Sequence, residues 1–74
     1  MDSIEDKLRE RLAEKFGGSP QLTDGLAFLG VDSIGMAELT VELEKEFNIQ
    51  IQDDIVDVET VQELADYIRA RGAT

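Results

Sequence analysis

LGVDSIGMAELTVELEKEFNIQI (residues 29–51) carries the clearest structural signals in the sequence. Asp32 carries a side-chain oxygen suited to capping a helix, and Asn48 tolerates the left-handed conformation that ends many helices. We therefore predict a helix over residues 33–47, followed by an extended link. The apolar residues expected on its core side recur at helical spacing: Met36, Leu39, Leu43 and Phe47.

The same helix is also apolar on the opposite side. Ile34, Ala37 and Val41 recur there at helical spacing, and Glu38 and Glu42 flank them. A helix with two apolar faces is either covered on both sides or docks onto a partner. Few elements are available to cover this helix, so we expect docking, with the long loop before it as the alternative cover.

A first helix is predicted within residues 2–16. Ser3 and Asp6 resemble a capping box at its start, and Gly17 is suited to end it. The connection over residues 17–31 is long and carries several apolar residues, so it should pack onto the core and contain at most a short helical turn. The apolar residues of the first helix are four positions apart: Ile4, Leu8, Leu12 and Phe16.

The last part of the chain predicts one short and one longer helix. DDIVDV (53–58) suits a single helical turn, and Thr60 with Glu63 forms a capping box before the final helix. The fold class is all-α, a small bundle of three main helices plus one short helix, hence four helices in all. The inner face of the final helix is predicted to hold Val61, Leu64, Ala65 and Ile68.

The amino-acid composition excludes several classes of function. The 74 residues are expected to form one domain over residues 1–74, and without cysteine or histidine they lack a thiol nucleophile, a disulfide and the usual general base. The net charge of −10 disfavours nucleic acid and favours basic protein partners. No apolar run is long enough to span a membrane, and the charged amino end is unlike a signal peptide. We expect a freestanding, monomeric, cytoplasmic protein.

Ser33 opens the second helix, directly after Asp32. The plain interpretation of Asp-Ser at this place is a capping device. However, a helix start favours phosphate, the second apolar face begins at the neighbouring Ile34, and the sequence has no histidine or cysteine to activate the serine. An anionic group attached to Ser33 by a visiting enzyme would suit this position.

The stretch from residue 29 to 51, together with VETVQELADYI (58–68), resembles the acyl carrier proteins of fatty-acid and polyketide synthesis. The resemblance implies an acyl-carrier-like helical fold. It also implies that Ser33 carries 4'-phosphopantetheine, transferred from coenzyme A by a magnesium-dependent phosphopantetheinyl transferase, with Asp32 helping to position the metal of that enzyme. The thiol of this arm would hold acyl intermediates as thioesters, and the protein itself would not be an enzyme.

The resemblance also assigns the second apolar face. Its partners would be acyltransferase, ketosynthase and other synthase enzymes with basic docking surfaces. The residues implied in partner recognition are Ile34, Ala37, Glu38, Val41 and Glu42.

Some residues depart from the family pattern and leave the pathway open. Gly35 stands where a larger or polar residue is more common, and glycine costs up to about 1 kcal/mol relative to alanine inside a helix. Ile34 completes an Asp-Ser-Ile motif that resembles that of the peptidyl carriers of nonribosomal synthesis. The preceding Gly30-Val31 differs from the Gly-Gly that is usual in those carriers. A peptidyl or aminoacyl carrier is therefore one alternative, and an unmodified acidic adaptor is another.

Two further hypotheses are weaker. The acidic segment of residues 53–59 lacks the central glycine and terminal glutamate of a calcium loop, so we expect a solvated segment and no metal site. Glu42 and Glu46 are four residues apart, a spacing that is usual for surface carboxylates and not for an acid–base pair. Phe28, Leu29 and Ile55 either seal the core or line the entrance of a cavity that shelters an acyl chain between helices.

Overall fold

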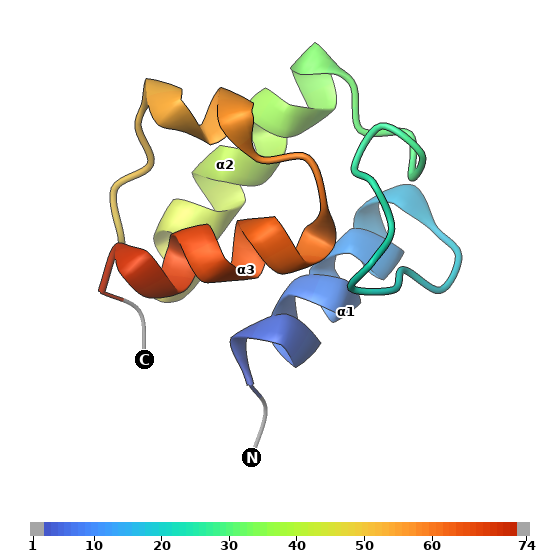
Figure 1. Cartoon of the computed structure of the whole chain (residues 1–74), viewed down its shortest axis with the longest axis horizontal. Coiled ribbons are helices and arrows are strands. Elements are labelled where there is room, and N and C mark those ends of the chain that lie inside the picture. The colour runs from blue at the N-terminus through green and yellow to red at the C-terminus, as the bar shows by residue number, and fades with distance from the viewer. Residues whose placement is uncertain (1–2, 73–74) are drawn as a thin grey trace.

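The computed structural model describes residues 3–72, which form three α-helices and one short 3-10 helix (Figure 1). The elements are α1 (Ile4–Phe16), α2 (Ser33–Phe47), η1 (Asp53–Asp57) and α3 (Val61–Ala70). The predicted all-α class with three main helices and one short helix is confirmed. The description as four helices in all is wrong, because η1 is a five-residue 3-10 helix, which leaves three α-helices in residues 3–72.

The helix starts are set by short polar side chains, as predicted. Ser3 accepts a hydrogen bond from the backbone N–H of Asp6 at 3.1 Å and caps the first helix, which begins at Ile4, while Asp2 lies outside the described residues. The reciprocal bond of the predicted capping box, from the Ser3 N–H to the Asp6 side chain, is not formed within residues 3–72. Thr60 and Glu63 form the complete reciprocal capping box of α3. Each side chain satisfies a backbone donor that has no partner inside its helix, and this defines where the helix begins.

The end of α2 follows the same logic. Asn48 adopts the left-handed conformation, with φ 54° and ψ 51°, and its N–H bonds to the carbonyl of Glu44. The chain then turns into an extended link in which Ile49 is buried and Ile51 is half-buried. The Glu44 carboxylate accepts a hydrogen bond from the N–H of Ile51 at 2.9 Å, so this side chain holds the link against the helix.

One apolar cluster joins all four elements and the long connection. The predicted inner face of α3 is fully buried, and in α2 the central leucines are buried while Met36 and Phe47 pack at the margin. Burial of this apolar area is the main source of stability in a domain of this size. The buried side chains are Ile4, Leu8, Leu12, Leu26, Leu39, Leu43, Ile49, Ile55, Val61, Leu64, Ala65 and Ile68.

The connection over residues 17–32 is attached to the start of α3. The Leu26 N–H donates to the Glu59 carbonyl at 2.7 Å, and the Val61 N–H donates to the Asp24 carbonyl at 3.1 Å. These bonds form an isolated antiparallel bridge between Gly25 and Thr60. Residues 3–72 contain no β-strand beyond this single bridge. The predicted packing of this connection is confirmed for Leu26.

Phe28 is the exception within that connection, because it is 82% exposed. The prediction that its ring seals the core is therefore wrong. A turn over residues 25–30, with the Leu29 N–H bonded to the Gly25 carbonyl at 3.2 Å, directs Leu29 to the core margin and leaves Phe28 on the surface. Ile55 in η1 is buried and seals the core as predicted.

The helix α1 packs along α3 (Figure 1). An ion pair joins the beginning of α1 to the end of α3. Arg69 Nη2 lies 2.7 Å from Glu5 Oε1 and 2.8 Å from Glu5 Oε2. Gln62 donates to the same Glu5 carboxylate at 3.2 Å. The hydrogen bond from Arg69 makes the largest contribution to lowering the pKa of Glu5, from 4.5 to about 2. Smaller contributions in the same direction come from hydrogen bonds donated by the Glu5 backbone and by Gln62.

Candidate functional site

Ser33 lies at the first position of α2 and its side chain is exposed. The Asp32 carboxylate accepts a hydrogen bond from the N–H of Gly35 at 2.7 Å, so it caps the helix as predicted. Within residues 3–72, the Ser33 hydroxyl and the N–H groups of Ser33 and Ile34 make no hydrogen bond. An accessible hydroxyl, two free amides and the positive end of the helix dipole therefore lie together at the start of α2, which suits an esterified phosphate.

Gly35, two residues after Ser33 in the first turn of α2, is buried, and the side chains of Phe16 and Asp32 lie close to it. A methyl group placed on Gly35 would lie 3.1 Å from Phe16 Cε1 and 3.1 Å from Asp32 Oδ1. The end of α1 therefore approaches the first turn of α2 at the point where a side chain is missing. Gly35, where acyl carrier proteins more often have a larger or polar residue, makes room for the ring of Phe16. The sequence alone did not predict this close contact.

An apolar hollow opens beside the first turns of α2. It is bounded by Met36 on the helix, by the connection before the helix, and by the segment that follows η1. Ser33 itself does not line the hollow, but Val31 and Met36, two and three residues from it in the sequence, do. The hollow thus offers an apolar surface near the start of α2 to part of a flexible group attached there. The lining residues are Gly25, Leu26, Ala27, Val31, Met36, Val58 and Glu59.

The second apolar face of α2 is open to solvent. Ile34 is 72% exposed, Val41 is 50% exposed and Ala37 is exposed between them. The alternative in which the long loop covers this face is therefore wrong. Ile34, Ala37 and Val41, called the apolar stripe below, form an uncovered strip that begins beside Ser33.

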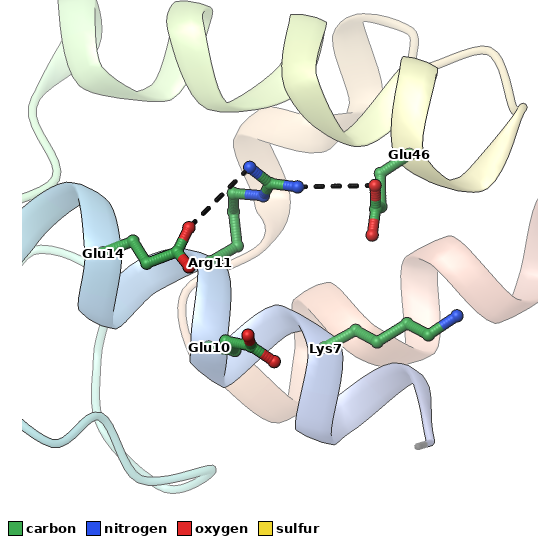
Figure 2. A pocket seen from close by; sticks show the side chains of 5 residues that line it. All are labelled: Lys7, Glu10, Arg11, Glu14 and Glu46. Carbon is green, nitrogen blue, oxygen red and sulfur yellow. Dashed lines mark ion pairs between the residues drawn. The ribbon is translucent and has the colours of Figure 1, made fainter. Parts of the chain in front are cut away.

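The acidic residues beside the apolar stripe are paired with cations of α1. Lys15 Nζ lies 2.6 Å from Glu42 Oε2 and 3.3 Å from Glu38 Oε2. Arg11 Nη2 lies 3.3 Å from Glu46 Oε2, and Arg11 Nη1 lies 3.7 Å from Glu42 Oε1. Figure 2 draws the pair of Arg11 with Glu46 as a dashed line. Glu38, Glu42 and Glu46, called the acidic edge below, thus face α1 with their charges partly compensated.

Sequence reasoning missed these pairs, although the sequence contains a signal for them. Arg11 and Lys15 are four residues apart, and the three glutamates of the acidic edge are also four residues apart. Two helices that pack side by side can match such spacings turn for turn. The signal becomes readable only once α1 and α2 are known to be neighbours.

The acidic segment around η1 gathers no metal site. In the described part of the chain, no group of three or more acidic side chains lies close enough to hold an ion. Asp54 instead accepts hydrogen bonds from the Tyr67 hydroxyl and from Arg71. The guanidinium of Arg71 also lies 4.7 Å from the centroid of the Tyr67 ring, so this carboxylate joins η1 to the end of α3.

The chain belongs to the phosphopantetheine attachment site family, whose model matches residues 6–68. It is also similar in structure to an acyl carrier protein from Thermotoga maritima, with a TM-score of 0.73 and 29% sequence identity, over 88% of this chain and 81% of that chain. The resemblance to acyl carrier proteins is confirmed, as is 4'-phosphopantetheine as the covalent cofactor of the family. This chain is thus a carrier protein of the acyl carrier fold.

The exposed serine, the free amides and the adjoining hollow fit such a cofactor, because the phosphate needs a positive environment and the flexible arm needs an accessible attachment point.

Within residues 3–72, no helix has both the length and the apolar character required to cross a membrane.

Proposed function

We propose that Ser33 is the attachment residue for 4'-phosphopantetheine and that this chain carries acyl intermediates as thioesters between fatty-acid or polyketide enzymes. The observation that carries the proposal is an exposed hydroxyl at the start of α2, next to two free amides, within the matched residues 6–68. No histidine or cysteine is present in the chain, so activation of the hydroxyl falls to a separate transferase.

Asp32 has two parts in this proposal. One carboxylate oxygen caps α2 through Gly35, while the other makes no hydrogen bond within residues 3–72. The free oxygen is available to the magnesium site of a docked transferase. The apolar stripe and the acidic edge supply the docking surface for that enzyme and for the synthase enzymes that use the loaded arm.

The test is intact-protein mass spectrometry before and after incubation with coenzyme A, magnesium and a broad-specificity phosphopantetheinyl transferase, followed by peptide mapping. We expect a gain of one phosphopantetheine, located on Ser33. Ser33→Ala should keep the fold and gain no mass. Loading of Ser33→Ala would contradict the site, and no loading of the native chain by its cognate transferase would favour an unmodified adaptor.

A second candidate is a peptidyl or aminoacyl carrier of nonribosomal synthesis, which the Asp32-Ser33-Ile34 sequence favours. The two functions differ in the group attached to the arm. Incubation of the loaded protein with acyl-donating and with amino-acid-activating enzymes, read by mass, separates them.

A further inference from the structure

The cations of α1 occupy the acidic edge before any partner arrives. Lys15 lies between Glu38 and Glu42, at 3.3 and 2.6 Å, and Arg11 reaches Glu42 and Glu46 at 3.7 and 3.3 Å. Every carboxylate of the acidic edge therefore has an internal counter-charge. A basic partner that docks along α2 meets carboxylates that are already paired.

The two members of the Lys15–Glu38 pair are not equally accessible. The side chain of Lys15 is 23% exposed, whereas that of Glu38 is 61% exposed. The Lys15 stem thus lies against the protein while the carboxylate of Glu38 remains reachable from solvent. Glu42 raises the pKa of Lys15, and Lys15 lowers the pKa of Glu42, so both side chains are charged near neutral pH.

The docked transferase must lie close to this edge. It has to reach Ser33, and the apolar stripe begins at the next residue, with Glu38 following Ala37 directly. The chain has a net charge of −10, so the enzyme surface that fits it is basic.

We propose that Lys15 and Arg11 act as internal competitors for the acidic edge, so that a basic transferase surface binds α2 by displacing cations of α1. This inference rests on the proposed function. The partner exchanges one ion pair for another, which limits its gain in affinity and favours rapid release. Removal of a competing cation should therefore strengthen binding beyond the effect of the change in net charge.

Lys7 provides the matched control. It lies on α1, two turns before Lys15, and takes part in no ion pair within residues 3–72. Figure 2 shows its side chain extending away from Arg11 and Glu14. Lys7→Met and Lys15→Met change the net charge equally and keep an unbranched apolar stem, but only the second removes a competitor.

The experiment measures the dissociation constant of the unmodified protein for a broad-specificity phosphopantetheinyl transferase, by calorimetry at low ionic strength without coenzyme A. We expect Lys15→Met to bind about two- to fivefold more tightly than Lys7→Met, the range that corresponds to one exposed ion pair. In a Glu42→Gln background the advantage of Lys15→Met should shrink, because the carboxylate that it exposes is gone.

Equal dissociation constants for Lys15→Met and Lys7→Met would overturn the proposal, since net charge alone would then explain both. Weaker binding by Lys15→Met would also overturn it, by making Lys15 a contact for the enzyme. Circular dichroism checks the fold, and if Lys15→Met is not native, Arg11→Gln takes its place with Lys7→Gln as control. Loading of Ser33 with phosphopantetheine is measured separately by mass spectrometry. Failure to load would contradict the proposed function. Normal loading together with equal dissociation constants for Lys15→Met and Lys7→Met would contradict only this inference.

Discussion

The ring of Phe16, at the end of α1, lies against Gly35, in the first turn of α2, so closely that a methyl group there would be 3.1 Å from Cε1 and 3.2 Å from Cζ. Such contacts are shorter than ordinary carbon–carbon packing distances. The absence of a side chain at position 35 therefore allows the end of α1 to approach the first turn of α2 closely, and substitutions at Phe16 and Gly35 should have coupled effects on stability.

Gly35→Ala should not deliver the gain of about 1 kcal/mol that alanine brings to a helix interior. Crowding against Phe16 and Asp32 offsets it, and we expect a net loss of up to about 2 kcal/mol in the free energy of unfolding. In a Phe16→Leu background, which removes the outer ring atoms, the same substitution should be less harmful or stabilising. Urea unfolding of the four proteins measures this coupling, and equal effects in both backgrounds would show that the contact is unimportant.

Asp32→Ala removes the cap of α2 and should lower the free energy of unfolding by about 1 kcal/mol. Asp32→Asn keeps an oxygen acceptor for the Gly35 N–H and should cost only a few tenths of that amount. If the carboxylate also serves the metal site of the transferase, both variants load phosphopantetheine more slowly than the native chain. A native initial rate for Asp32→Asn, followed by mass spectrometry, would limit Asp32 to capping.

Val41→Asp and Glu38→Lys should each weaken binding to a basic transferase several-fold while the fold is retained, because both side chains are largely open to solvent. Glu10→Lys is the control for charge, since Glu10 is an exposed residue of α1 that forms no ion pair within the described residues. The dissociation constant is measured for all three. If Glu10→Lys weakens binding as much as Glu38→Lys, the location of the charge has no importance and the docking face is misplaced.

Glu5 makes stability dependent on pH on the acidic side. Its pKa in the folded protein, about 2, lies below the usual 4.5, so its contribution is present above pH 4.5 and is lost as the pH falls through about 2. Glu5→Gln should therefore show a smaller loss of unfolding free energy between pH 4.5 and 2 than the native chain. Urea unfolding across this range tests it, with Glu10→Gln as control. Parallel curves for Glu5→Gln and the native chain would contradict the role of the Arg69 pair.

Most of the fold was predictable because the helix signals are local. Asp32 and Asn48 bound α2 at the predicted residues, and Thr60 with Glu63 forms the predicted capping box. Phe28 could not be placed in the same way. Its exposure depends on a turn whose backbone is held by the start of α3, and apolar composition alone does not reveal such a constraint.

The site divides along the same line. The position of Ser33 at the start of α2 and the open apolar stripe follow from helical spacing. The pairing of Lys15 with Glu42 and the contact of Phe16 with Gly35 depend on how α1 lies against α2, which no single-helix pattern contains. Sequence reasoning therefore predicted the open apolar stripe but not the cations of α1 that pair with the acidic edge.

The ion pair between Glu5 and Arg69 also has a practical meaning for handling the protein. It holds the beginning of α1 beside the end of α3, and both lie at the opposite side of the molecule from the start of α2 (Figure 1). A tether that continues from the beginning of α1 or from the end of α3 would thus start on the side of the molecule opposite Ser33. Chains anchored to a bead or a sensor chip through such a tether should still present the serine to enzymes in solution.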